Sequence, residues 1–225
     1  GTPAIAKEIP TATPESVGMS TERLKRIAPA MQKYIDQSLT PGVITAVLRK
    51  GKLVHFKVQG DMDVDANTAM RDDAIFRIAS MTKPIASVAL MMLWEEGHFQ
   101  LRDPVAKFIP AFANVKVKTE GAPDTLVALK RPIQIRDMLT HTAGLANSYR
   151  GDIEAYRAAF AGAPVKDNAE LIAKLTTLPL NYQPGEDWQY SIATDVVGHL
   201  VEIISFLKLL VILQYCRVVL RQFSA

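Results

Sequence analysis

A serine and a lysine stand three positions apart at the start of an apolar stretch, Ser80 and Lys83 within residues 76–84. Positions i and i+3 of a helix share a face, so Ser80 Oγ and Lys83 Nζ can reach each other. A serine hydroxyl becomes a nucleophile when a neighbouring base takes its proton, and a lysine amine with a lowered pKa can be that base. A helix N-terminus and partial burial both disfavour an ammonium group. The spacing therefore indicates a serine nucleophile beside a lysine base.

A second pair, Ser205 and Lys208, has the same spacing. An isolated match of this kind is more often a helix-capping serine and a solvated lysine. Context separates the two matches, because Ser80 opens a predicted helix whereas Ser205 falls inside one that begins near Thr194. We therefore expect the nucleophile at Ser80.

Tyr190 provides the first match with a possible partner, just after a turn at residues 183–186. A phenol near a lysine can relay the proton of the nucleophile and later return it to the leaving group. Taken alone, Tyr190 is better interpreted as an aromatic side chain packed at the mouth of the helix that follows.

Four motifs occur in one order, and the following segments carry them: residues 76–83, 101–110, 138–145 and 184–191. Together they resemble the serine β-lactamase and penicillin-binding-protein superfamily, above all its class C-like members and the family VIII carboxylesterases. The resemblance extends over about residues 13–205. It implies an α+β fold in which helices flank an antiparallel sheet and a helical lobe is inserted. It also implies Ser80 as the acylated nucleophile and Lys83 with Tyr190 as the base system, without cofactor or metal.

The sequence departs from many β-lactamases and peptidases at the tyrosine, where Tyr190-Ser191-Ile192 replaces Tyr-x-Asn. The missing amide would otherwise engage Lys83 and the acyl-amide side chain of a β-lactam. Its loss favours a carboxylesterase acting on short-chain esters. β-Lactamase or D-amino-acid peptidase activity stays open as an alternative, and so does a catalytically weak fragment that acts only in binding.

The resemblance stops at Ser205, and residues 206–225 form an atypical tail. The Lys-Thr-Gly-type strand motif expected later in the superfamily is absent, so we expect the C-terminal strands and one of two oxyanion donors to be missing. The Ser80 backbone N–H is the oxyanion donor that we expect to be present. A truncated gene, a frameshift, a genuine short variant and a sequence artefact are all consistent with this tail. We accordingly expect a hydrolase domain at residues 1–205 followed by the tail.

Composition and charge indicate which kinds of partner the chain can bind. With 225 residues, 48% hydrophobic content and a net charge of +3, the chain can bury one sizeable core and has no basic cluster for nucleic acid. Its four histidines are widely spaced, so we expect each to be a packed or helix-capping residue and not a metal ligand. The apolar run at residues 206–213 is too short and too interrupted to span a membrane, and it favours a buried helix or an aggregation-prone surface through which the chain could self-associate. A single cysteine, Cys216, is compatible with a cytoplasmic location, although a first residue Gly1 leaves a removed signal peptide open.

Periodicity and turn residues predict the elements. We expect a helix from Ser20 to about residue 37, a hairpin of strands at residues 43–49 and 52–58, and a loop at residues 60–73. A mostly buried helix should run over residues 80–96 and end at Gly97. The remaining expectations are a small hairpin between residues 115 and 129 and helices at residues 135–140, 153–160, 169–176 and 194–204.

Overall fold

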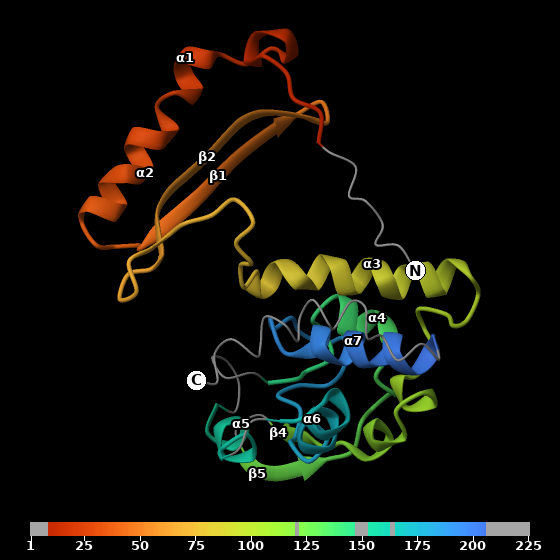
Figure 1. Cartoon of the computed structure of the whole chain (residues 1–225). Helices are drawn as coiled ribbons and strands as arrows, with labels where there is room; N and C mark the ends of the chain where they lie inside the picture. Colours follow the sequence, from red (N-terminus) through yellow and green to blue (C-terminus); the bar gives the residue numbers. More distant parts are fainter. Residues whose placement is uncertain (1–8, 120–121, 147–152, 163–164, 206–225) are drawn as a thin grey trace. The chain divides into compact units, whose positions relative to one another are not determined.

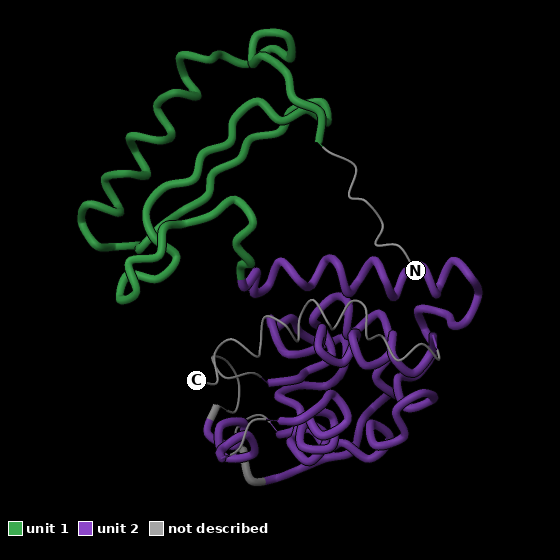
Figure 2. The backbone as a smooth tube through the Cα atoms, viewed as in Figure 1, with its two compact units in different colours: residues 1–76 green, residues 77–225 purple. Residues whose placement is uncertain are grey.

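The computed structural model describes residues 9–119, 122–146, 153–162 and 165–205. The chain divides into two compact units, residues 1–76 and residues 77–225 (Figure 2). The atypical tail at residues 206–225 lies outside the described residues, so the expected boundary after Ser205 stays a prediction.

The first unit is a small antiparallel sheet with helices along it (Figure 1). Its sheet has the order β1-β2-β3, formed by β1 (Gly42–Arg49), β2 (Lys52–Asp63) and β3 (Thr68–Ala69). The β1–β2 turn confirms the predicted hairpin: Lys50 and Gly51 have φ of 50° and 71°, the left-handed conformations of a two-residue turn. A 3₁₀ turn, η1 (Pro14–Val17), precedes helices α1 (Thr21–Leu24) and α2 (Ile27–Asp36).

Two expectations for this unit were wrong. The single helix is interrupted, although Ser20 does cap α1 by accepting a hydrogen bond from the Arg23 N–H. Pro29 explains the restart at Ile27, because proline lacks an N–H and fits only the first turn of a helix. The predicted loop at residues 60–73 contains the end of β2 and all of β3. Glycine and aspartate, which are poor strand formers, obscured that pairing in the sequence.

The second unit is mostly helical (Figure 1). Its elements in chain order are η2 (Ala79–Met81), α3 (Thr82–Glu95), η3 (Val105–Lys107), η4 (Pro110–Asn114), β4 (Val117–Thr119), β5 (Ala122–Val127), α4 (Ile135–Leu139), α5 (Ile153–Ala159), α6 (Asn168–Leu175) and α7 (Ala193–Ile204). The four predicted helices from α4 to α7 agree with the structure to within a residue at each end, and β4–β5 confirms the small hairpin.

Helices α3 and α7 pack side by side over one hydrophobic core (Figure 1). Fully buried side chains from α3, the 3₁₀ segments, α4 and α7 meet there, among them Leu90, Phe112, Met138 and Leu200. Ala193 and Val196 place the first turn of α7 in this core, and Ala86 and Ala89 of α3 pack against it.

Helix α3 differs from its prediction in two ways. It starts at Thr82 rather than at Ser80, because a 3₁₀ turn precedes it. It is also not buried all round: Leu90 and Leu93 face the core, but Met81, Val88 and Met92 are 56–71% exposed. The predicted end is confirmed. Gly97 has φ of 81° and closes the helix with Gly97 N–H to Trp94 O and His98 N–H to Leu93 O bonds.

Candidate active site

Ser80 lies in the 3₁₀ turn η2, which directly precedes α3. Its predecessor Ala79 has φ of 45°, a left-handed conformation that costs a residue with a side chain of its own some free energy. Ser80, which directly follows this left-handed residue, is exposed. Strained backbone of this kind gathers at functional positions.

Two side chains converge on the Ser80 hydroxyl. Lys83 Nζ donates to Ser80 Oγ over 3.2 Å, as the three-residue spacing predicts. The Tyr190 hydroxyl donates to the same Oγ over 2.7 Å, although 110 residues separate the two in sequence. Lys83 Nζ also lies 4.9 Å from the centre of the Tyr190 ring. The structure thus brings together all three residues that the sequence singled out.

The electrostatics of this cluster act on the phenol. Hydrogen bonds with Ser80 and then with Lys83 lower the pKa of Tyr190, because both groups can donate to a phenolate and Lys83 carries a positive charge. A phenol with a lowered pKa gives up its proton more readily than an ordinary tyrosine does. The cluster therefore places two groups that can exchange protons within hydrogen-bond distance of one serine hydroxyl.

The competing pair at Ser205 is different. Ser205 caps the C-terminus of α7 instead of lying inside the helix, and its hydroxyl donates to the Val201 carbonyl over 2.7 Å. Lys208 lies outside the described residues. This arrangement is that of a helix-end serine, the ordinary interpretation of an isolated match.

His141 is the neighbour that the sequence did not assign to the site. Its ring lies 4.7 Å from the Tyr190 ring, centre to centre, with the planes inclined by 38°. The Ser191 backbone N–H, buried in the protein, donates to His141 Nδ1 over 3.2 Å. The sequence did place His141 among packed or capping histidines, and it does occupy the end of α4. Only the folded chain shows that this helix end touches Tyr190.

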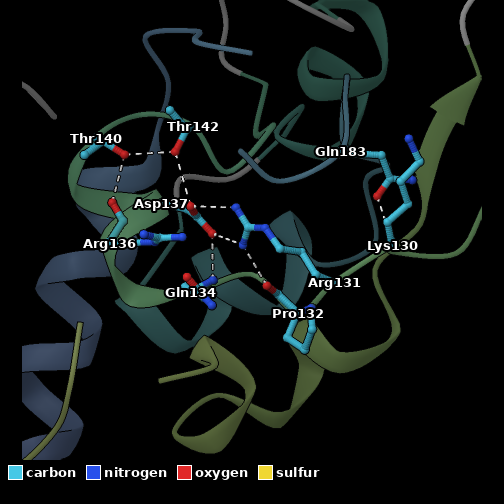
Figure 3. Close-up of polar contacts among 9 residues, drawn as sticks. All are labelled: Lys130, Arg131, Pro132, Gln134, Arg136, Asp137, Thr140, Thr142 and Gln183. Atoms are coloured by element: carbon cyan, nitrogen blue, oxygen red, sulfur yellow. Dashed lines mark hydrogen bonds and ion pairs between the residues drawn. The ribbon is translucent and has the colours of Figure 1, made fainter. Parts of the chain in front are cut away.

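A buried ion pair stabilises the helix end that carries His141 (Figure 3). Asp137, on α4 and only 2% exposed, accepts two hydrogen bonds from the Arg131 guanidinium, at 2.6 and 3.0 Å. The same carboxylate accepts from the Gln134 N–H at 2.8 Å and from the Thr142 hydroxyl at 3.3 Å. Asp137 also raises the pKa of Arg131 through this pairing. The bond from Thr142 thereby ties the residue that follows His141 to this buried carboxylate.

The chain segment before Tyr190 is hydrogen-bonded to residues that shortly precede Arg131 in the sequence. Gln183 accepts from the Lys130 N–H at 2.9 Å and donates to the Ala128 carbonyl at 3.0 Å (Figure 3). Gly144 lets this segment approach closely, because a Cβ there would lie 2.4 Å from the Tyr182 carbonyl oxygen. An open cavity of about 720 Å³ lies beside Arg131 and Asp137, but neither Ser80, Lys83 nor Tyr190 lines it.

The residues that the structure describes also bear on cofactors and membranes. Nowhere in that part of the chain do three or more His, Cys, Asp or Glu side chains gather in a group that could hold a metal ion. Within the same residues, none of the helices combines the length and the apolar character needed to cross a bilayer.

A family model described as Beta-lactamase matches residues 27–213, which is most of the chain. The chain belongs to the beta-lactamase family. Membership confirms the predicted fold class, a β-lactamase-like α+β fold with antiparallel sheets and helices.

Three relatives of this beta-lactamase-family chain illustrate its neighbourhood. An uncharacterized protein of Mycobacterium tuberculosis is 38% identical over 175 residues, covering 76% of this chain and 43% of that protein. Esterase EstB of Burkholderia gladioli is 31% identical over 188 residues, covering 78% of this chain and 45% of the esterase. The solved structure of EstCE1, a hydrolase with promiscuous acyltransferase activity, matches with a TM-score of 0.70 and 26% identity, covering 82% of this chain and 48% of that one. The chain therefore spans less than half the length of these relatives.

Proposed function

We propose that this chain carries the reactive centre of a serine hydrolase that cleaves short-chain carboxylic esters through an acyl-enzyme. The convergence of Lys83 Nζ and the Tyr190 hydroxyl on Ser80 Oγ is the single observation that supports this best. A family that includes an esterase and a hydrolase among its members supports the reaction class.

In the first step, Ser80 Oγ attacks the ester carbonyl carbon while its proton passes to the Lys83–Tyr190 pair, which has beforehand lost one proton to solvent and so can accept it. The carbonyl π electrons move to the oxygen, and the Ser80 backbone N–H is our expected donor to that oxyanion. Collapse of the tetrahedral species breaks the bond to the alcohol oxygen, which takes a proton from Tyr190. The products of this half are a free alcohol and an acyl-Ser80 ester.

The second half transfers the acyl group to water. The relay takes a proton from water, the resulting hydroxide attacks the acyl carbonyl, and the bond to Ser80 Oγ breaks as the proton returns to it. Lys83 Nζ lies near the Tyr190 ring, and both residues contact Ser80 Oγ, the oxygen that must lose and regain a proton. These contacts support the use of the same two groups in both halves of the reaction. A carboxylic acid leaves, and the starting state is restored.

The preference for esters over β-lactams rests on Ile192, which stands at the N-cap of α7 where an amide would serve the acyl-amide of a β-lactam. An unmade hydrogen bond to a buried group costs about 1–3 kcal/mol, or roughly tenfold to a hundredfold in rate. We therefore expect a higher kcat/KM for p-nitrophenyl butyrate than for nitrocefin, and loss of both activities in Ser80→Ala. A matched variant, Ser205→Ala, should retain both. The opposite ranking of the two substrates would favour the β-lactamase alternative, and full activity in Ser80→Ala would refute the proposed centre.

A further inference from the structure

His141 occupies a backbone position at which a helix usually ends with glycine. It is the residue after the cap of α4, it has φ of 59°, and the Thr142 N–H returns to the Asp137 carbonyl over 2.9 Å. The end of α3 is built in the same way, with Gly97 at the corresponding position. Glycine is favoured there because a side chain in the left-handed conformation meets the backbone. The geometry of the helix end alone therefore does not explain why a histidine stands at the end of α4.

The contacts of His141 show what the imidazole does instead. Its Nδ1 accepts from the Ser191 N–H, and its ring packs on the Tyr190 ring. Its backbone carbonyl accepts from the Gln189 N–H at 3.0 Å and from the Tyr182 hydroxyl at 3.2 Å. One residue therefore holds the chain on both sides of Tyr190 and covers one face of the phenol.

The charge state of the imidazole agrees with this contact. Burial, and after it the positive charge of Lys83, lower the pKa of His141. A neutral ring whose Nδ1 accepts from a backbone N–H carries its proton on Nε2. The titratable groups that face it include Lys83 from α3, Tyr190 beside the ring and Tyr182 at its carbonyl. Protonation would place a second N–H opposite that of Ser191 and break the bond.

We propose that His141 is a positioning residue, which keeps the Tyr190 phenol on Ser80 Oγ and beside Lys83. The effect of His141 on catalysis rests on the proposed function. The positioning of Tyr190 by His141 does not depend on turnover. Displacing a relay group by about 1 Å can cost roughly a hundredfold in rate, so a helix end that tolerates an unfavourable backbone conformation gains a fixed phenol.

Two substitutions separate positioning from a mere structural role. His141→Gly suits the left-handed backbone and removes both the acceptor and the ring. His141→Asn also tolerates that backbone and keeps an acceptor for the Ser191 N–H, but it removes the ring. His98→Asn changes an exposed histidine and is the matched control. We expect both His141 variants to melt within about 3 °C of the wild type, since the helix end itself prefers such residues.

The readout is the ionisation of Tyr190, followed by NMR in protein labelled with ¹³C at tyrosine Cζ and assigned with Tyr190→Phe. We expect the lowered pKa of Tyr190 to return toward 10 in His141→Gly, to change less in His141→Asn and to stay in His98→Asn. For p-nitrophenyl acetate, kcat should fall by roughly 10- to 100-fold in His141→Gly with little change in KM.

The outcomes distinguish this inference from the proposed function. A shifted Tyr190 titration in a protein without ester turnover would support positioning and count against the esterase. An unchanged titration and kcat in His141→Gly would overturn positioning. A melting temperature lowered by more than about 10 °C in both His141 variants would also overturn it, because the histidine would then be a structural cap.

Discussion

At the residue scale, one oxygen organises the site. Ser80 Oγ accepts from Lys83 through a spacing that local helix geometry dictates. Its second partner, Tyr190, reaches it only because α3 and α7 pack together in the folded chain. The first contact was predictable from residue spacing alone. The second was predictable only through the family resemblance, since no local periodicity links positions so far apart.

Lys83→Arg tests whether a removable proton is needed at this position. Arginine keeps the positive charge but does not deprotonate in proteins, so it cannot serve as a base. We expect acylation of Ser80 by p-nitrophenyl acetate to slow by at least about a hundredfold, the range of a lost general base. Lys107→Arg, at the exposed pair with Asp103, should leave the rate unchanged. Equal rates in wild type and Lys83→Arg would mean that Lys83 acts by charge only.

Tyr182 gives the site a dependence on alkaline pH. Burial, with a contribution from the charge of Asp187, raises the pKa of Tyr182 to about 12. A group with a raised folded pKa contributes stability fully below its unfolded pKa near 10, and this stability is lost as the pH rises toward 12. We expect a loss on the order of 1–2 kcal/mol in the free energy of unfolding across this window. Urea titrations of wild type and Tyr182→Phe at pH 9 and 11 should show a smaller loss in the variant.

At the scale of elements, the short helix α4 and its following turn are the support of the site. A five-residue helix is not stable by itself, so its position depends on the buried Asp137 and its partners. Sequence periodicity predicted this helix, and a motif drew attention to its end. Burial of Asp137 and its pairing with Arg131 are tertiary features that composition and spacing did not reveal.

Arg131→Ala should destabilise the second unit by about 3 kcal/mol, because it leaves a buried carboxylate without its cation. Lys130→Ala, one position earlier, breaks the exposed pair with Glu186 and should cost less than about 1 kcal/mol. Denaturant unfolding followed by tryptophan fluorescence measures both changes. Equal effects of the two substitutions would show that burial of Asp137 does not set the strength of its pair.

At the scale of the whole molecule, the sequence predicted the two early strands and the helices of the second unit well, because each has its own periodicity or cap. It missed β3 and the interruption between α1 and α2, where glycine, aspartate and proline obscured the pattern. It also overestimated the burial of α3. An apolar pattern does not reveal which faces of a helix the rest of the chain covers.

The exposed face of α3 predicts self-association. Ile85, Val88 and Met92 of α3, with Met81 just before its first residue, recur at helical spacing on one side and are 48–71% exposed. Contiguous apolar surface of this kind marks an interaction or aggregation site. Sedimentation velocity should show concentration-dependent association of the 225-residue chain. Val88→Glu should reduce it, whereas Glu95→Gln on the same helix should not. A monomer at every concentration would refute this prediction.

Covalent labelling identifies which serine is the nucleophile. A fluorophosphonate ester mimic reacts with an activated serine, and peptide mass spectrometry then locates the adduct. We predict modification at Ser80 alone, retained in Ser205→Ala and abolished in Ser80→Ala. An adduct at Ser205 or Ser191, or ester hydrolysis by a sample in which no serine is labelled, would contradict the account.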